Sequence, residues 1–139
     1  MQTKKILILC TGNSCRSQIA EAFLKSLDKN LEVHSAGTNP TEKVNPYAIK
    51  IMQEIGIDIS KNTPKNVNEF LADEFDYVIT VCDGAKESCP MFTGKVKNRL
   101  HMGFEDPADA TGTESEIMNV FRKIRNQTKE EFLKFSNNL

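Results

Sequence analysis

The first forty residues alternate between a strand pattern and a helix pattern. Residues 6–9 form a continuous apolar run, Ile-Leu-Ile-Leu, which is typical of a central parallel strand that is covered on both faces. From Ser17 onward, helical spacing predicts an amphipathic helix whose apolar positions are Ile19, Ala20, Phe23, Leu24 and Leu27. Residues 31–36 alternate between apolar and polar side chains, so we expect a second strand that ends at Gly37.

The middle of the chain contains a helix with defined start and stop residues. Asn45 followed by Pro46 predicts a helix N-terminus, because asparagine caps the first free N–H groups and proline is preorganised for the first helical position. Gly56 provides a residue that ends helices in a left-handed conformation. Residues 66–71 predict a shorter helix.

The second half contains two further strand patterns and a long helix. Residues 77–81, Tyr-Val-Ile-Thr-Val, are β-branched or aromatic and predict a strand. Residues 96–102 predict a fourth strand, which is more polar and therefore nearer an edge of the sheet. Thr113 and Glu116 fit a capping box. It opens a final helix with one stripe formed by Ile117, Val120, Phe121, Ile124, Thr128, Phe132 and Phe135.

Strands that alternate with helices predict an α/β fold with a parallel sheet. We expect a single domain over residues 1–139, built in three layers, with a four-stranded parallel sheet flanked by helices. Ligands in such sheets bind beyond the carboxyl ends of the strands. Cys10 and Cys82 both lie at such ends, so we expect them to be neighbours in space although they are far apart in the sequence.

Composition and charge narrow the classes of partner. The chain has a net charge of −1 with 27% charged residues, so it lacks the basic field that favours nucleic acid or an anionic membrane. No apolar stretch approaches the roughly 20 residues of a membrane span. The N-terminal apolar run is also too short for the core of a signal peptide. We therefore expect a cytoplasmic protein, with a monomer as the default state.

The segment from Cys10 to Ser17, Cys-Thr-Gly-Asn-Ser-Cys-Arg-Ser, contains the most specific chemistry in the sequence. It places a thiol at the end of a strand and an arginine at the start of a helix. Such a loop surrounds an oxyanion with backbone N–H groups, the positive end of a helix and a bidentate guanidinium. We predict that Cys10 is a nucleophile and that the oxyanion is bound by Thr11, Gly12, Asn13, Ser14, Cys15 and Arg16.

The same groups should activate Cys10, because a thiol is nucleophilic only as its thiolate. The N–H groups and Arg16 are expected to lower the pKa of the Cys10 thiol, and Ser17 is placed to donate a hydroxyl hydrogen bond to the sulfur. Gly12 allows a positive φ in the turn, and Asn13 tolerates one. The alternative is a buried structural cysteine beside a solvated arginine. A Walker phosphate loop is excluded, because no Gly-Lys-Ser/Thr sequence ends the segment.

A second pair of thiols, Cys82 and Cys89, is separated by six residues. Paired zinc ligands are usually about two to four residues apart with a second pair nearby, and neither His34 nor His101 completes such a set. The polar residues between the two thiols predict a short, marginal helix that must unwind before the sulfurs can bond. We therefore favour a redox pair over a zinc site, a structural disulfide or incidental buried cysteines.

Residues 10–21, Cys-Thr-Gly-Asn-Ser-Cys-Arg-Ser-Gln-Ile-Ala-Glu, resemble the low-molecular-weight protein tyrosine phosphatase superfamily, and most of all its branch of thioredoxin-coupled arsenate reductases. The resemblance covers nearly the whole chain, through Ser-Ala-Gly at 35–37, Gly-Ile-Asp-Ile-Ser at 56–60, the Cys82/Cys89 pair, and Gly-Phe-Glu-Asp-Pro-Ala at 103–108.

The resemblance implies that Asp106 is the general acid, whereas an Asp-Pro pair taken alone more often marks only a turn. Tyrosine phosphatases usually place aromatic residues just after this motif. This chain has Ala-Asp-Ala at 108–110, which favours a small inorganic substrate.

In the mechanism that the resemblance implies, three thiols act in turn. Cys10 attacks arsenate while Asp106 protonates the departing oxygen. Cys82 then attacks Cys10 and releases arsenite, and Cys89 attacks Cys82 to give a Cys82–Cys89 disulfide. Thioredoxin reduces that disulfide, with glutathione and glutaredoxin as the alternative reductant. Cys15 is a bystander in this scheme, or a partner that protects Cys10 from over-oxidation.

Two other functions share part of this evidence. A phosphatase acting on small or protein phosphomonoesters would use the same Cys10, Arg16 and Asp106, so weak phosphatase activity and binding of phosphate or sulfate are expected in either case. Such an enzyme does not need the Cys82/Cys89 pair. A non-enzymatic oxyanion-binding or thioredoxin-docking protein needs neither an intact nucleophile nor an acid.

Some members of the family bind potassium beside the loop, with residues that match Asn13, Glu21 and Ser35 here. A further acidic ligand is expected where this chain has Lys65. We predict that the Lys65 ammonium occupies or weakens the potassium site and that no cofactor is tightly bound. A Lys65 that is simply solvated is the alternative.

Overall fold

The computed structural model of the chain describes residues 4–82, 84 and 89–139. In chain order the elements are β1 (Lys5–Cys10), α1 (Arg16–Leu27), β2 (Glu32–Gly37), α2 (Pro46–Gln53), the 3₁₀ helix η1 (Val67–Phe70), β3 (Phe75–Thr80), β4 (Val96–His101), the 3₁₀ helix η2 (Pro107–Asp109) and α4 (Glu114–Asn137). The predicted elements that fall within these residues are present close to their expected bounds. The helix predicted between Cys82 and Cys89 lies outside the described residues.

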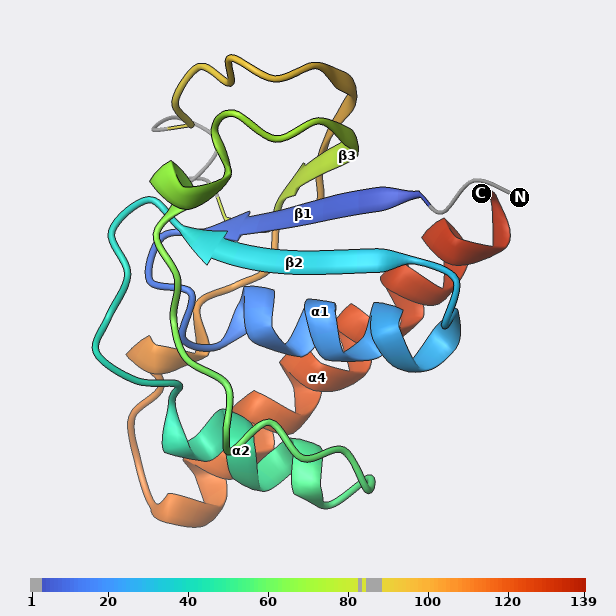
Figure 1. Cartoon of the computed structure of the whole chain (residues 1–139). Coiled ribbons are helices and arrows are strands. Elements are labelled where there is room, and N and C mark those ends of the chain that lie inside the picture. Colours follow the sequence, from blue (N-terminus) through green and yellow to red (C-terminus); the bar gives the residue numbers. More distant parts are fainter. Residues whose placement is uncertain (1–3, 83, 85–88) are drawn as a thin grey trace.

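The four strands form one parallel sheet in the order β2-β1-β3-β4 (Figure 1). Cys10 at the end of β1 pairs with Gly37 at the end of β2, and Leu9 pairs with Thr80 at the end of β3. The carboxyl ends of these three strands therefore meet at one edge of the sheet. The predicted α/β fold with a four-stranded parallel sheet is confirmed.

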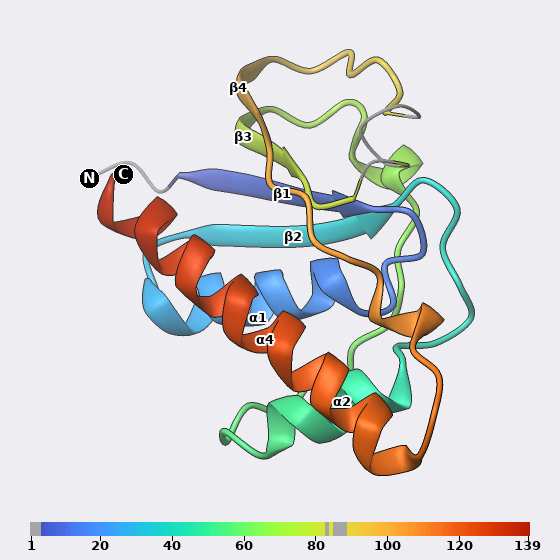
Figure 2. The same ribbon diagram turned by 180° about the vertical axis from the view of Figure 1, so that it is seen from behind.

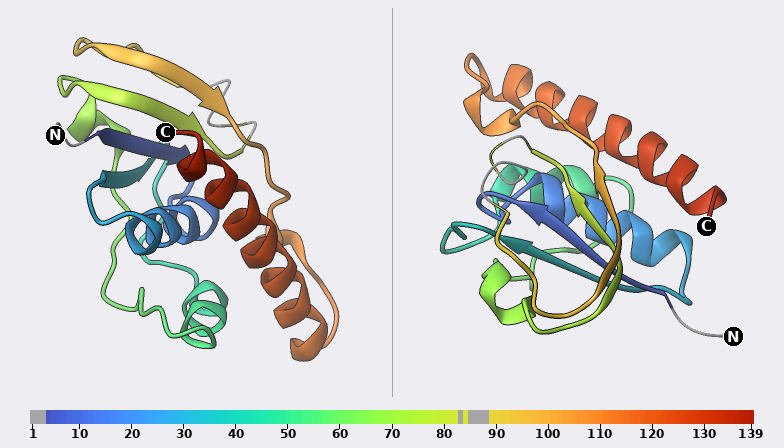
Figure 3. Two further views of the ribbon diagram at one scale, coloured as in Figure 1. Left: turned by 90° about the vertical axis from the view of Figure 1, so that its right-hand side faces the viewer. Right: turned by 90° about the horizontal axis from the view of Figure 1, so that it is seen from above.

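Helices α1 and α4 pack against each other and cover one face of the sheet, and η1 lies on the other face (Figure 1 and Figure 3). Figure 2 shows α4 running diagonally across α1, with α2 against the N-terminal part of α4. Two groups of buried side chains result. One joins the strands to η1 and the end of α4, and the other fills the space between α1, α2 and α4.

Helix α4 begins as the sequence predicts. The Thr113 hydroxyl accepts a 3.1 Å hydrogen bond from the backbone N–H of Glu116, whose carboxylate reaches back to the N–H of Thr113. At the other end, Phe135 meets the ring of Tyr77 edge to face, with 5.1 Å between centroids. Phe132 and Phe135 are thus buried against the sheet, which fixes the C-terminal part of the long helix across it.

Strand β4 is exposed along most of its length, which confirms the prediction of an edge strand. It pairs with β3 on one side only, so its outer backbone groups face solvent. None of the helices in the described part of the chain is long and apolar enough to cross a membrane.

Candidate active site

The loop between β1 and α1, residues 10–16, is fixed by backbone hydrogen bonds from the segment that follows β2. The carbonyl oxygens of Cys10, Thr11, Gly12 and Ser14 accept hydrogen bonds of 2.8 to 3.1 Å from backbone N–H groups within residues 38–45. A trans peptide points its C=O and its N–H in opposite directions. The N–H groups of this oxyanion loop are therefore turned toward its interior, where an anion would lie.

Close backbone approach at the end of β2 requires a glycine. A Cβ atom at Gly37 would lie 2.4 Å from the carbonyl oxygen of Thr11 and 3.1 Å from the backbone nitrogen of Asn13. Neither atom belongs to a side chain that could swing away. The Ser-Ala-Gly segment at 35–37 is thus part of the packing that shapes the oxyanion loop.

Of the two loop residues for which the sequence allows a positive φ, Asn13 adopts one and Gly12 does not. Asn13 has a φ of 51°, and Gly12 is not among the residues with positive φ. A short amide side chain stabilises the left-handed conformation by local hydrogen bonding. Gly12 instead serves packing, because a Cβ atom there would approach Cγ2 of Thr41 to 3.1 Å.

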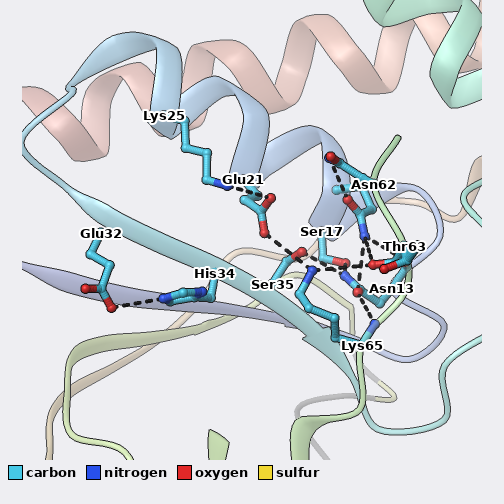
Figure 4. Close-up of polar contacts among 11 residues, drawn as sticks. Asn13, Ser17, Glu21, Lys25, Glu32, His34, Ser35, Asn62, Thr63 and Lys65 are labelled. Atoms are coloured by element: carbon cyan, nitrogen blue, oxygen red, sulfur yellow. Dashed lines mark hydrogen bonds and ion pairs between the residues drawn. The ribbon is translucent and has the colours of Figure 1, made fainter. Parts of the chain in front are cut away.

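The Asn13 side chain is fully buried and uses its whole hydrogen-bonding capacity (Figure 4). Its amide nitrogen donates to the hydroxyls of Ser17 and Ser35 at 2.8 and 2.9 Å. Its amide oxygen accepts from the backbone N–H of Lys65 at 2.8 Å and from the side chain of Gln18 at 3.2 Å. Four bonds from three parts of the chain hold the strained residue in place.

The N-terminus of α1 is left available for an anion. Cys15 occupies the N-cap position and makes no side-chain capping hydrogen bond, so the first helical N–H groups have no such partner. Arg16 is the first residue of the helix, and Ser17 behind it is fully buried. Since Ser17 accepts its bond from Asn13, its own hydroxyl proton is available for donation, and its bond to sulfur stays a prediction.

The turn after β4 brings the predicted acid to the predicted arginine. Nη1 of Arg16 donates a 3.0 Å hydrogen bond to the carbonyl oxygen of Phe104, and Nη2 of Arg16 lies 3.6 Å from the Asp106 carboxylate. The Asp106 side chain is 41% exposed, whereas that of Arg16 is 12% exposed. Both belong to a cavity of about 540 Å³ lined by Thr11, Arg16, Cys82, Gly84, Gly103, Phe104, Glu105 and Asp106.

Cys10 and Cys82 are neighbours, as their strand ends predict. β1 and β3 are adjacent, and the N–H of Val81 donates to the carbonyl of Leu9 at 2.9 Å. Cys10 and Cys82 are each 3% exposed, and Cys82 is close enough to be the main influence on the pKa of Cys10. The Thr11 hydroxyl lies 3.3 Å from the Cys82 sulfur. All four cysteines are in the reduced thiol form.

The pKa of Cys10 is raised in this state, contrary to our expectation. Its hydrogen bond to the Cys82 thiol is the largest cause, and burial adds to it, while Arg16 and the backbone N–H of Thr11 lower the pKa. Burial raises the pKa of Cys15 to about 12. The loop groups thus act on Cys10 in the expected direction, but the second thiol outweighs them.

Cys89 lies in a more open setting than the other thiols. It is half-buried, and its sulfur is 3.7 Å from the carbonyl oxygen of Pro90. Burial raises the pKa of Cys89, and the Arg99 guanidinium lowers it through its charge and a hydrogen bond. The third predicted thiol is therefore close to solvent and beside a cation.

The residues matched to a potassium site surround a lysine (Figure 4). Glu21 is buried, with one carboxylate oxygen 3.2 Å from the Lys25 ammonium and the other 3.9 Å from that of Lys65. Lys65 Nζ also lies 3.4 Å from the carbonyl oxygen of Thr63. Ser35 is linked to Lys65 through Asn13, whose side chain donates to the Ser35 hydroxyl and accepts from the backbone N–H of Lys65.

Three contributions were not predicted from the sequence. Thr11 was assigned only to the oxyanion, yet its hydroxyl contacts Cys82. Gln18 supports Asn13 from the first turn of α1, and Arg99 stands beside Cys89. The sequence signal for Arg99 is a row of cations at every second position along the edge strand, formed by Lys95, Lys97 and Arg99.

Residues 5–139 match the family described as low molecular weight phosphotyrosine protein phosphatase. An arsenate reductase of Halalkalibacterium halodurans is 44% identical over 137 residues, which are 98% of this chain and 97% of that protein. A solved arsenate reductase in the phosphate binding state has a TM-score of 0.77 at 34% identity, with 96% of each chain covered. A thioredoxin-dependent arsenate reductase of Corynebacterium glutamicum has a TM-score of 0.65 at 28% identity, with 99% of this chain and 64% of that chain covered. The chain therefore belongs to the low molecular weight phosphotyrosine protein phosphatase family.

Proposed function

We propose that this protein reduces arsenate to arsenite with three thiols, Cys10, Cys82 and Cys89, and that thioredoxin regenerates it. The proposal rests on the placement of two buried thiols, Cys10 and Cys82, at the adjacent ends of paired strands beside Arg16. A phosphatase needs one nucleophilic thiol, whereas an oxyanion reductase needs a second thiol within reach of the first. Relatives that are 44% identical and named arsenate reductase support the same assignment.

In the first step the Cys10 sulfur attacks arsenic in an arsenate ion that is bound by the oxyanion loop and Arg16. A sulfur–arsenic bond forms, and one oxygen departs with a proton from Asp106, so that water leaves instead of hydroxide. The 3.6 Å separation of Asp106 from Arg16 supports these roles, because both groups must reach the same small ion. Binding of the anion also brings negative charge to the free N–H groups of α1.

In the second step the Cys82 thiolate attacks Cys10. A Cys10–Cys82 disulfide forms, the sulfur–arsenic bond breaks, and its electron pair remains on arsenic, which leaves as arsenite. The two thiols are oxidised and arsenic is reduced by two electrons. The 3.3 Å contact with the Thr11 hydroxyl supports this step, because a hydroxyl donor stabilises a thiolate and holds it near its target.

In the third step Cys89 attacks Cys82, and Cys10 leaves as a thiolate. The disulfide moves from a pair of buried sulfurs to one that includes half-exposed Cys89, where a protein reductant finds access. Thioredoxin then supplies two electrons. The thioredoxin-dependent relative supports this reductant.

The cation beside the loop is proposed to be the ammonium of Lys65. The buried Glu21 carboxylate has two lysine neighbours from its own chain, so its charge is balanced without a metal ion. A carboxylate ligand at position 65 would have favoured potassium, and a lysine disfavours it by charge repulsion.

A phosphomonoesterase is the alternative, and it is favoured by the same trio of Cys10, Arg16 and Asp106. Hydrolysis would require water to attack the Cys10 adduct before a thiol does. Since Cys82 lies buried beside Cys10 at the ends of paired strands, the thiol is closer to the adduct than bulk water. We therefore expect phosphatase activity to be weak and not to require Cys82 or Cys89.

Arsenite production with thioredoxin, thioredoxin reductase and NADPH tests the proposal on wild type, Cys82→Ser and Cys89→Ser. Both variants are expected to lose turnover and to keep slow hydrolysis of p-nitrophenyl phosphate. Cys15→Ala is the matched control, because it removes a thiol that has no step in the scheme, keeps the backbone N–H of the loop and adds no capping hydroxyl, so turnover should persist. Mass mapping after one arsenate cycle should find Cys82 joined to Cys89. Normal turnover by Cys89→Ser would remove the third step.

A further inference from the structure

The surroundings of Cys89 contain an arginine that the cascade has not used. A cavity of about 240 Å³ opens beside the thiol on the outer part of the sheet, lined by Val78, Thr80, Cys89, Arg99, Leu100 and His101. Arg99 pairs with Val78 across β3 and β4, so both side chains stand on the same face of the sheet. The cavity therefore joins a half-buried sulfur to a guanidinium on a rigid strand.

Arg99 is held in place by an aromatic ring. Its guanidinium carbon lies 5.7 Å from the centroid of the Phe92 ring, which is a cation–π distance. Phe92 is itself fixed, because its ring meets that of Phe75 at 6.1 Å in a T-shaped arrangement. A long side chain that is stacked in this way loses less conformational freedom when it also faces a thiolate.

Within the described residues, few ionisable side chains line the cavity beside Cys89. Arg99 and His101 are the groups lining this cavity that bear or acquire charge, both from β4, and β3 contributes Val78 and Thr80, which do not titrate. The His101 ring is 2.8 Å from the Thr80 hydroxyl. Burial disfavours the charged form of the Cys89 thiol, and Arg99 opposes that effect by charge and by hydrogen bonding.

We propose that Arg99 is a positioning residue for Cys89, whose thiolate it stabilises and directs for the attack on Cys82. The role in turnover rests on the proposed function. In the assisted step, Cys89 loses its proton to solvent and its sulfur attacks Cys82 in the Cys10–Cys82 disulfide. The Cys82–Cys89 bond forms, the Cys10–Cys82 bond breaks, and the electron pair leaves on Cys10. No net oxidation occurs, so no further reagent is needed.

The direct test is the rate at which neutral iodoacetamide modifies Cys89 in the reduced, whole protein between pH 7 and pH 10.5, followed by peptide mass mapping. Arg99→Gln removes the charge, so the pH midpoint should rise. A higher pKa lowers the thiolate fraction tenfold per unit but raises intrinsic nucleophilicity about threefold. For a rise of about one unit in the pKa of Cys89, we therefore expect Arg99→Gln to be modified about threefold more slowly than wild type at pH 7. The difference should narrow toward pH 10.5.

Two variants serve as controls. Lys97→Gln removes another cation from the same exposed strand, but Lys97 pairs with Asp76 at 3.2 Å, so the Cys89 profile should not move. Arg99→Lys keeps the charge and loses the planar fork, and it should restore part of the rate. A deficit that is equal at every pH, or equal in Lys97→Gln, would mean a merely structural effect and would overturn the proposal.

Turnover gives a second readout. Single-turnover release of arsenite needs Cys10 and Cys82 only, so Arg99→Gln should leave it unchanged while turnover with thioredoxin falls about threefold at pH 7. If single-turnover release falls equally, Arg99 does not act through Cys89. The alkylation profile does not depend on arsenate at all, so failure of the cascade in Cys89→Ser and failure of the Arg99 role are separate outcomes.

Discussion

The oxyanion loop and the surroundings of Cys89 each present a thiol beside an arginine, yet they are built in opposite ways. In the loop, backbone carbonyls are bonded outward, Asn13 is fully buried with four hydrogen bonds, and Cys10 is 3% exposed. Near Cys89 the neighbouring strand β4 is largely exposed, and Met91 is 89% exposed.

The difference follows from what each thiol must meet. A small oxyanion is recognised by fixed donors, so the loop gains from being rigid before the ion arrives. A protein reductant must reach its sulfur from outside, so Cys89 gains from lying near an open edge. Rigidity and access are thus separated along the sheet, and substitutions in the two regions should have unequal effects.

Gly37→Ala should damage the loop most. The added methyl group collides with backbone atoms of Thr11 and Asn13, so we expect a loss of roughly 3 kcal/mol in unfolding free energy and of arsenate and phosphate binding. Thermal unfolding and titration calorimetry measure both. Gly56→Ala is the control, because Gly56 has a φ of 81° and open space around it. It should cost about 1 kcal/mol and leave binding intact.

Full oxyanion binding by Gly37→Ala would show that the loop tolerates rearrangement, and the contrast between a rigid and an open region would fail.

Cys82→Ala should make Cys10 more reactive before any substrate binds. The Cys82 hydrogen bond raises the pKa of Cys10, so its removal lowers that pKa and increases the thiolate fraction at neutral pH. Alkylation of Cys10 at pH 7, measured by mass mapping, should become about threefold faster for each unit by which the pKa falls. Cys89→Ala is the control and should leave the rate unchanged. Unchanged or slower alkylation in Cys82→Ala would mean that Cys82 is not the main cause of the raised pKa of Cys10.

Lys65→Met should make the protein respond to potassium. Without this ammonium, buried Glu21 keeps one lysine neighbour, and we expect a loss of about 1 kcal/mol that added potassium partly restores. Wild type should show equal melting temperatures in potassium and sodium. Lys61→Met, which alters an exposed lysine of the same connection, is the control. A wild-type protein stabilised by potassium far more than by sodium would contradict the role of Lys65.

Met91→Ser should have the smallest effect. Its side chain is almost wholly exposed, so the unfolding free energy should change by less than about 0.5 kcal/mol. Chemical denaturation measures the change. A clear destabilisation would mean that the region after Cys89 is as tightly packed as the loop.

Local patterns were sufficient for much of the fold. The apolar run of β1, the Asn45–Pro46 helix start and the Thr113 capping box each depend on residues that are close in sequence. The proximity of Cys10 and Cys82 could also be predicted from the sequence, because the carboxyl ends of adjacent parallel strands meet at one edge of the sheet.

The remaining features depend on contacts between distant segments. The sequence allows a positive φ at Gly12 or Asn13, but the hydrogen bonds from Asn13 to Ser35 and from Lys65 to Asn13, which favour Asn13, join distant segments. The raised pKa of Cys10 comes from a thiol on another strand. A local sequence pattern indicates the type of a residue and the face on which it lies, but not which distant residue contacts it.

The strand order of the sheet gives the proposed cascade a direction. Cys10 ends β1, Cys82 follows β3, and Cys89 stands beside β4, and these strands are successive neighbours in the order β1-β3-β4. Each sulfur-to-sulfur transfer therefore moves one strand outward, from the centre of the molecule to its rim. Substrate and reductant work at opposite ends of this path, so arsenate need never share a binding surface with the protein that supplies its electrons.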